Sequence, residues 1–253
     1  MRIEILAANP NERGHALTGF LVNGRIAVDA GPMASFAPVQ AQAEIDHILL
    51  THSHIDHVAG LPILLDSVYG LRSTPPQVYA LPSTLDSLQR DIFNNRLMPD
   101  FIEFSRVMTP FVELHAVEPN RPFAVDSLII TPIPVDHTVP TVAYLLDDCE
   151  VACAVVTDTA PVPAVMAELG RLPRLRAVFL ECSFPRRMNG LAEVSRHLHT
   201  GTFAEMVGLL PAHVRVYATH IKPHFYDEVC DEIAGLNLPN VQIGTPGTLV
   251  SLT

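Results

Sequence analysis

Short apolar segments alternate with turn-forming residues along the chain. Residues 1–6, 19–22 and 25–29 have the length and apolar content of strands. The last two flank Asn23-Gly24, a dipeptide that tight hairpins favour. This pattern predicts that the chain begins as an antiparallel sheet.

The pattern continues with further strands and with helices. Strands are expected at residues 47–51, 112–115, 128–134, 141–146, 151–157, 177–181 and 214–219. Helical spacing is found at residues 58–67, interrupted by Pro62, at 84–93 behind a Ser83 cap, and at 163–169, 202–210 and 226–234. A less regular stretch rich in Pro and Phe follows residue 93.

The expected elements form one continuous series. No long linker, low-complexity run or repeat of roughly 20 to 50 residues divides them. At 253 residues the chain is long enough to bury a substantial core, and we expect a single domain over residues 1–253. Strands precede helices in each half, which predicts an α/β domain with two sheets in the middle and helices outside.

Composition narrows the class of protein. Apolar residues make up 48% of the chain and the mean hydropathy is +0.26, which argues against disorder. No window approaches the roughly 20 uninterrupted apolar residues of a membrane span, and the first residues lack a signal peptide's apolar region. We therefore expect a cytoplasmic protein with no membrane partner. The four cysteines form no CxxC pair and are expected to be reduced.

The charge balance bears on the class of substrate. The formal net charge is −11, Lys is nearly absent and the Arg residues are scattered. A protein that holds a long polyanion usually carries clustered Lys and Arg, because these residues release its counterions. The composition therefore favours a small-molecule substrate over an extended nucleic acid.

The run that follows the strand at 47–51 holds four potential metal ligands, His52, His54, Asp56 and His57. Because side chains alternate along a strand, His52 and His54 can point to one side and bind one ion. If the backbone then turns into a helix, Asp56 and His57 face a second ion beside the first. A polar loop with exposed histidines would explain a single His better than it explains this run.

A two-metal site needs more ligands, and three residues that follow expected strands supply them. His137 follows residues 128–134, Asp158 follows the very apolar residues 151–156, and His220 follows residues 214–218. A carboxylate has two oxygens, so Asp158 can bridge two ions. Each residue alone is a weak signal, because an Asp at a strand end is more often a helix cap. Together they complete the ligand shells of two ions.

This order of ligands resembles the metallo-β-lactamase superfamily, whose fold is a four-layer αββα sandwich with a dinuclear metal centre at one edge. The resemblance covers essentially the whole chain, including residues 18–22 and 28–31. Within the superfamily the chain is similar to the class II 3',5'-cyclic-nucleotide phosphodiesterases. Residues 54–61, 91–100, 180–184, 196–198 and 219–223 carry that similarity. Ile55, Met98 and Arg196 stand where the class usually has Leu, Trp and Gly.

The resemblance implies a ligand set and a mechanism. Asp158 would bridge two divalent metal ions, with His52, His54 and His137 on one ion and Asp56, His57 and His220 on the other. Zn is the expected metal, with Mn or Fe as alternatives, because mixed carboxylate and imidazole sites accept all three. A hydroxide bridging the ions would attack the phosphodiester.

Four residues are candidate catalytic residues: Asp56, Glu181, His197 and Lys222. His197 would transfer a proton to the leaving oxygen, and Glu181 would orient its imidazole or hydrogen-bond a ligand. Lys222 would balance phosphate charge. The structural alternatives are a turn cap for Glu181 and solvated surface positions for His197 and Lys222. The early hairpin of this superfamily lies near the mouth of the pocket, which would bring His15 close to it.

The sequence therefore predicts a phosphodiesterase that hydrolyses 3',5'-cyclic nucleotides such as cAMP to 5'-monophosphates. An RNA-processing nuclease of the tRNase Z kind is an alternative, against which the acidic composition argues. A β-lactamase would normally carry an export signal. A non-catalytic metal-binding protein is a further alternative, but all seven candidate ligands are present. A homodimer is compatible with the sequence and not required by it.

Overall fold

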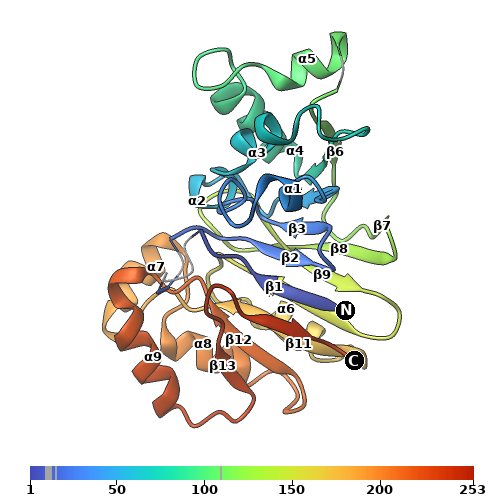
Figure 1. Cartoon of the computed structure of the whole chain (residues 1–253). Coiled ribbons are helices and arrows are strands. Elements are labelled where there is room, and N and C mark those ends of the chain that lie inside the picture. The colour runs from blue at the N-terminus through green and yellow to red at the C-terminus, as the bar shows by residue number, and fades with distance from the viewer. Residues whose placement is uncertain (9–12, 15, 109) are drawn as a thin grey trace.

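The computed structural model describes residues 1–8, 13–14, 16–108 and 110–253. Two seven-stranded sheets face each other, and helices cover their outer sides (Figure 1). The four-layer αββα sandwich expected from the sequence is confirmed.

The first sheet has the strand order β14-β1-β2-β3-β4-β5-β6. Its strands are β1 (Arg2–Ile5), β2 (Phe20–Val22), β3 (Ile26–Val28), β4 (His47–Leu49), β5 (Gln77–Ala80), β6 (Glu113–Ala116) and β14 (Leu249–Ser251). β1, β2 and β3 are antiparallel, as predicted, and Asn23 and Gly24 have the positive φ that a tight hairpin requires. From β3 to β6 the neighbours are parallel, so their C-terminal ends share one edge.

The second sheet has the strand order β13-β12-β11-β10-β9-β8-β7. Its strands are β7 (Phe123–Val125), β8 (Leu128–Val135), β9 (Thr141–Asp147), β10 (Ala152–Val156), β11 (Leu175–Glu181), β12 (Arg215–Thr219) and β13 (Val241–Ile243). β7 to β10 are antiparallel, and β10 to β13 are parallel. The C-terminal ends of β10, β11 and β12 therefore also share one edge.

The helices are α1 (Val39–Gln42), α2 (Ile55–Val58), α3 (Leu61–Val68), α4 (Pro82–Ser87), α5 (Phe101–Val107), α6 (Pro163–Leu169), α7 (Asn189–Ser195), α8 (Thr200–Val207) and α9 (Tyr226–Gly235). A π-helical turn at Leu88–Ile92 continues α4. Side chains of α1 to α5 pack on the outer face of the first sheet, and those of α6, α8 and α9 pack on the second (Figure 1). Within the described part of the chain, no helix has the length and apolar content to cross a membrane.

The core between the sheets is built from apolar side chains of both. Phe20 of β2 and Phe179 of β11 are fully buried, with their ring centroids 5.4 Å apart in an edge-to-face arrangement. Burying a side chain of this size stabilises the fold by about 1.5–3 kcal/mol. The two sheets are thereby fixed against each other, and the loops at their shared edge are held in place.

Two expectations about helices are corrected by the structure. The helix expected at 58–67 is two helices, α2 and α3, and Pro62 lies in the first turn of α3, where a missing N–H breaks no hydrogen bond. The Ser83 cap is wrong, because α4 begins at Pro82 behind Leu81 without a side-chain cap. The stretch rich in Pro and Phe contains α5, which Asp100 caps through the N–H of Glu103.

Candidate metal centre

The seven residues predicted as metal ligands meet at one edge of the sandwich: His52 and His54 after β4, Asp56 and His57 in α2, His137 after β8, Asp158 after β10, and His220 after β12. β10, β11 and β12 are parallel, so the last two positions reach the same edge. Asp158 and His220 have φ of 43° and 56°, a left-handed conformation that non-glycine residues rarely adopt and that recurs at functional sites.

The first group consists of His52, His54, His137 and Asp158. His54 Nδ1 lies 3.0 Å from His52 Nε2 and 3.2 Å from His137 Nε2. Asp158 Oδ2 lies 3.6 Å from His52 Nε2 and 3.7 Å from His137 Nε2. These four atoms converge on one small volume, as the ligands of a single metal ion must.

The second group consists of Asp56, His57, Asp158 and His220. Asp158 Oδ1 lies 3.3 Å from His57 Nε2 and 3.2 Å from His220 Nε2. Asp56 Oδ2 is 3.8 Å from each of the same two nitrogens. Asp158 thus contributes Oδ2 to the first group and Oδ1 to the second.

Two histidines are oriented by groups that can only accept a hydrogen bond. His57 Nδ1 donates to Asp29 Oδ2 at 2.7 Å, and His137 Nδ1 donates to the carbonyl oxygen of Arg196 at 3.1 Å. A proton on Nδ1 leaves the lone pair of a neutral imidazole on Nε2, which faces the group in each case. Outer hydrogen bonds of this kind fix the tautomer and orientation of metal-binding histidines.

Asp29 is a further residue of the site that no sequence motif indicates. It is fully buried at the end of β3, accepts hydrogen bonds from the N–H and hydroxyl of Thr51, and binds His57. Because the Thr51 hydroxyl proton goes to Asp29, the Thr51 oxygen accepts from His52 Nδ1 at 3.0 Å. The signal in the sequence was an acidic residue directly after a strand parallel to β4.

Burial and neighbouring charges divide the histidines by protonation. Burial holds the pKa of His52 and of His220 well below the ordinary value, so both rings are neutral at pH 7. Burial also disfavours charge on His57, but the carboxylates of Asp158 and Asp29 outweigh it and raise the pKa of His57 well above the usual range. In the metal-free protein, His57 is therefore charged between Asp158 and Asp29, and an ion entering the second group would take the place of its Nε2 proton.

Two buried polar atoms show that this site fits a cation. Asp158 Oδ1 and His57 Nε2 are buried and form no hydrogen bond within the described part of the chain. Leaving such atoms without partners costs about 1–3 kcal/mol each. A divalent metal ion would satisfy both, and the mixture of imidazole and carboxylate donors suits Zn, Mn or Fe.

Glu181 and His197 form a third group, which shares Asp158 with the other two. Glu181 is fully buried and accepts four hydrogen bonds, from the N–H groups of Thr159 and Leu198, from the hydroxyl of Ser183 and from His197 Nδ1. The last of these is 2.9 Å long. Burial opposes protonation of His197, but Glu181 outweighs it and raises its pKa. Glu181 therefore lies where it orients the imidazole, and His197 is not a surface residue.

Lys222 is the only lysine in the sequence. Its Nζ donates to His220 Nε2 at 2.8 Å and lies 3.7 Å from Asp56 Oδ2. The side chain is 30% exposed, so it is not simply solvated. An ammonium group at this place faces the same atoms that a second metal ion would contact.

The other residues singled out in the sequence are Ile55, Met98, Arg196 and His15. Ile55 is largely exposed between His54 and Asp56, whereas Met98 is partly buried against the core that α3 and α5 form with the first sheet. Arg196 contacts His137, as described above. His15 lies outside the described residues.

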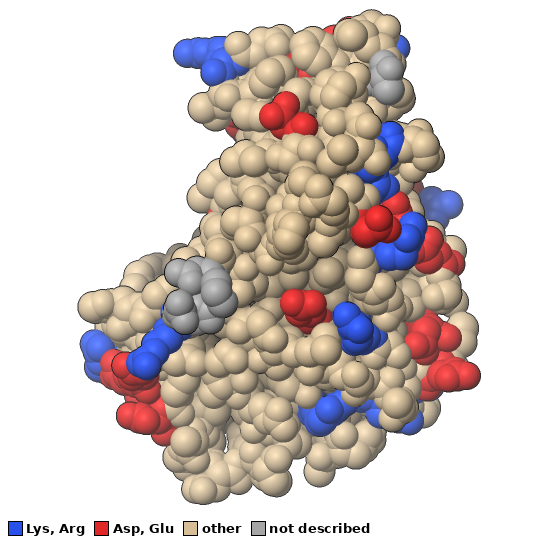
Figure 2. All heavy atoms as spheres, viewed as in Figure 1, with Lys and Arg blue, Asp and Glu red and all other residues tan. Residues whose placement is uncertain are grey.

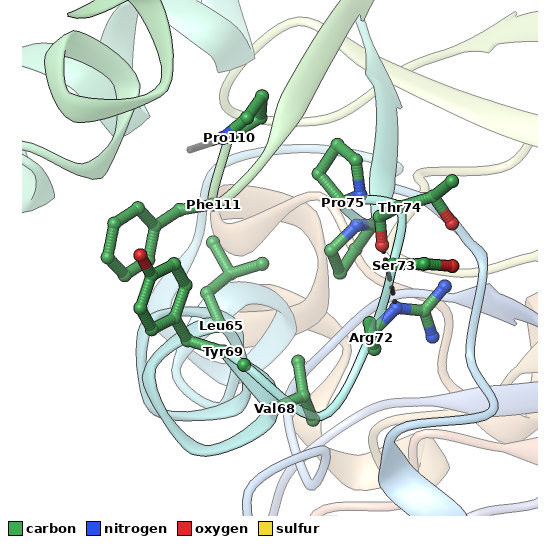
Figure 3. Close-up of a pocket in the computed structure, with 11 residues that line it drawn as sticks. Leu65, Val68, Tyr69, Arg72, Ser73, Thr74, Pro75, Pro110 and Phe111 are labelled. Atoms are coloured by element: carbon green, nitrogen blue, oxygen red, sulfur yellow. Dashed lines mark hydrogen bonds between the residues drawn. The ribbon is translucent and has the colours of Figure 1, made fainter. Parts of the chain in front are cut away.

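A hollow of about 150 Å³ lies between α3, the chain before β5 and Phe111 (Figure 3). Thr74 and Pro75 precede β5, whereas the centre follows the opposite end of the parallel strand β4. The Arg72 guanidinium is engaged with the carbonyls of Ala43 and Ile45 and with Asp46. The hollow therefore offers no free cationic group for an anionic substrate.

Residues 24–221 match the family model of the beta-lactamase superfamily domain. The chain belongs to the metallo-β-lactamase superfamily. Its structural neighbours include a protein with the metallo-β-lactamase fold. The family match and the His/Asp cluster identify the chain as a metallo-β-lactamase-fold hydrolase with a candidate site for divalent metal ions.

Solved structures show the same fold over the whole chain. Yeast PDE1 is 18% identical, with a TM-score of 0.79 over 99% of each chain. The metallo-β-lactamase fold protein YhfI from Bacillus subtilis is 16% identical, with a TM-score of 0.76 over 98% of each chain. The short form of human tRNase Z is 14% identical, with a TM-score of 0.72 over 100% of each chain. No curated protein sequence matches the chain.

Proposed function

We propose that this metallo-β-lactamase-fold hydrolase cleaves 3',5'-cyclic nucleotides such as cAMP to 5'-monophosphates, using two divalent metal ions. The observation that carries the proposal is the division of Asp158 between two groups of ligand atoms, one oxygen to each. Two adjacent cations suit a phosphodiester, because the attacking and leaving oxygens both need stabilisation. The similarity of residues 91–100 and 219–223 to the class II phosphodiesterases narrows the substrate.

Seven residues would hold the ions: His52, His54 and His137 the first, Asp56, His57 and His220 the second, and Asp158 both. When bound, such ions neutralise phosphoryl charge and lower the pKa of water from 15.7 to about 7. We propose Zn, with Mn and Fe as alternatives. Imidazole and carboxylate donors accept all three.

The ribose oxygen that leaves phosphorus needs a proton, and we propose that His197 supplies it. Its Nδ1–H is held by Glu181 Oε1, so Nε2 is the nitrogen left to exchange a proton. The raised pKa keeps this imidazole charged over a wider pH range than a free histidine. We assign proton donation to His197 and orientation of its ring to Glu181.

Asp56 and Lys222 carry opposite charges at the second group and have complementary roles in this proposal. Asp56 Oδ2 lies in the second group, and Lys222 Nζ lies 3.7 Å from it. A phosphate oxygen that enters the second group would meet the Lys222 ammonium, which offsets negative charge accumulating in the transition state.

The charge of the surface supports a small substrate. Lys and Arg are interspersed with Asp and Glu on the face shown in Figure 2, and many charged residues there stand singly. Exposed pairs such as Arg187 with Glu228 and Arg90 with Asp86 further offset the basic side chains. An extended RNA would need a continuous basic path for its phosphates.

The test is a substrate panel on the purified protein after its metal content has been measured. We expect turnover of cAMP to 5'-AMP, weaker cleavage of a generic aryl phosphodiester, and no cleavage of a precursor tRNA. Cleavage of the tRNA with cAMP untouched would favour the tRNase Z-like alternative. Bound metal with no turnover of any phosphodiester would favour a non-catalytic metal-binding protein.

The cytoplasmic location and a homodimer stay predictions.

A further inference from the structure

Arg196 ends helix α7 in a left-handed conformation, with φ 53° and ψ 54°. The backbone N–H groups of Arg196 and His197 bond to Glu193 and Ala192 carbonyls, which close the helix at this residue. Glycine takes this conformation without a steric penalty, and arginine does not. The contacts of the Arg196 side chain are ones that glycine could not make at this position.

The Arg196 side chain makes two contacts with one loop. Its Nη1 forms a close ion pair with Asp136 Oδ1 and also donates to the carbonyl oxygen of His137 at 3.3 Å. Both partners lie in the loop between β8 and β9. The guanidinium therefore holds the backbone of the segment that carries His137.

The Arg196 main chain makes a third contact with the same segment. Its carbonyl oxygen accepts the Nδ1–H of His137 at 3.1 Å, across 59 positions in the sequence. One residue thus fixes His137 twice, through the backbone carbonyl of His137 and through its ring. The hydrogen bond to the ring also sets the tautomer that leaves Nε2 toward the first group.

We propose that Arg196 is a positioning residue for the first group and that its guanidinium raises the affinity of the ion held there. The proposal rests on the metal binding that the proposed function requires. The effect is confined to the first group, because His137 belongs to that group alone. In the second group, His57 bonds to Asp29, and His220 Nδ1 lies 2.8 Å from the hydroxyl oxygen of Thr18. Arg196 and Asp136 are about half exposed, so solvent screens their attraction.

The substitution Arg196→Gly isolates the side chain. Glycine keeps the left-handed turn and the carbonyl oxygen, and it removes only the contacts of the guanidinium. We expect the first ion to bind roughly three- to tenfold more weakly and the binding of the second ion to stay unchanged. The expected loss is smaller than the roughly 10–100-fold that follows when a direct hydrogen-bond partner of a metal ligand is removed. Asp136→Asn should weaken the binding of the first ion by a similar factor. The double variant should bind that ion no more weakly than either single variant does.

The readout is titration of the full-length protein with Co²⁺, followed by visible absorption, with chelator competition for Zn²⁺. His137→Ala and His57→Ala identify the signals of the first and second ions. Arg187→Gly is the matched control, because Arg187 also forms an ion pair with an acidic side chain, Glu228, and no bond with a candidate ligand is found for it. Circular dichroism of the metal-free variants reports whether each is folded.

The outcomes separate the proposal from its alternatives. If Arg196→Gly binds both ions as the wild type does, or loses both equally while Arg187→Gly loses neither, the assignment to the first group is overturned. A wild-type protein that binds two ions but leaves cAMP intact would refute the proposed substrate. It would leave the role of Arg196 standing, because the readout is affinity rather than turnover.

Discussion

The first and second groups share Asp158 but differ in charge and in anchoring. The first combines three imidazoles with one carboxylate oxygen, and its member His54 is only half-buried. The second has two carboxylates and two buried imidazoles, with the ammonium of Lys222 against it. Affinity in the first group should therefore depend on how the rings are oriented, and affinity in the second on the balance of nearby charge.

Removing the shared ligand should abolish the difference between the groups. We expect Asp158→Ala to lose both ions and at least a thousandfold of the turnover, because each group loses an oxygen and the nucleophile is no longer activated. Metal analysis and a cAMP assay check this. Glu118→Ala, which removes an exposed carboxylate paired with Arg121, is the control. Retention of one tightly bound ion in Asp158→Ala would contradict bridging by Asp158.

Removing His197 should leave both groups intact and still stop the chemistry. We expect His197→Ala to bind two ions normally and to lose about 10²–10⁴-fold in turnover, the usual contribution of a positioned proton donor. The comparison of metal content with kcat on cAMP checks this. A substrate with a nitrophenol leaving group, which needs no proton to depart, should be affected much less. Unchanged kcat on cAMP would remove His197 from the mechanism.

Removing the outer partner of His57 should affect the second group more than the first. Asp29→Asn keeps the shape of the side chain and removes its charge, so we expect about 10–100-fold weaker binding of the second ion. The first ion should lose less affinity, because Asp29 reaches His52 through the Thr51 hydroxyl and not directly. Sequential titration with Co²⁺ measures both affinities. An equal loss at both groups would show that Asp29 supports the fold, through Thr51, more than it supports His57.

Removing the ammonium should strengthen the second group. In Lys222→Met, Asp56 and His220 lose a positively charged neighbour, so we expect the second ion to bind up to about fivefold more tightly, within the range of a partly exposed ion pair. Turnover should fall nevertheless, because the phosphate loses its counter-charge. Chelator competition and kcat report the two effects, and weaker ion binding in Lys222→Met would refute the competition between lysine and metal.

The smallest effect is a pH dependence of stability that His197 adds in metal-free protein. Its pKa is raised in the folded state above the unfolded value of about 6.5, so its contribution is fully present below pH 6.5 and is lost as the pH rises through the folded-state pKa. In urea denaturation with chelator present, the free energy of unfolding of the wild type should therefore exceed that of His197→Gln by more at pH 6 than at pH 9. In a Glu181→Gln background, this excess should no longer depend on pH.

The sequence predicted which polar side chains meet at one edge better than it predicted the elements around them. His52, His54, Asp56 and His57 were visible because a local run of polar residues interrupts an apolar pattern, and the later candidates because each follows a strongly apolar strand. The structure brings all seven together at one edge. Their roles as ligands stay proposals.

Other features depend on contacts that no local pattern encodes. β13 and β14 are three residues long and are defined by pairing with β12 and β1, and their side chains are mixed in exposure. Asp29 reads locally as a turn residue, and its bond to His57 spans 28 positions. The contact of Arg196 with His137 is equally remote in sequence. Such partners become visible only when strand order is known.

The position of the candidate ligands has a consequence for how the sandwich comes apart. His52, His54, Asp56 and His57 extend from the first sheet, and His137, Asp158 and His220 extend from the second. Bound ions would therefore cross-link the two sheets, closing chain loops of about a hundred residues or more. Each ion would stabilise the fold by about 4 kcal/mol at a free metal concentration of 1,000 times its Kd. Opening the sandwich at this edge would then be limited by the rate of metal release.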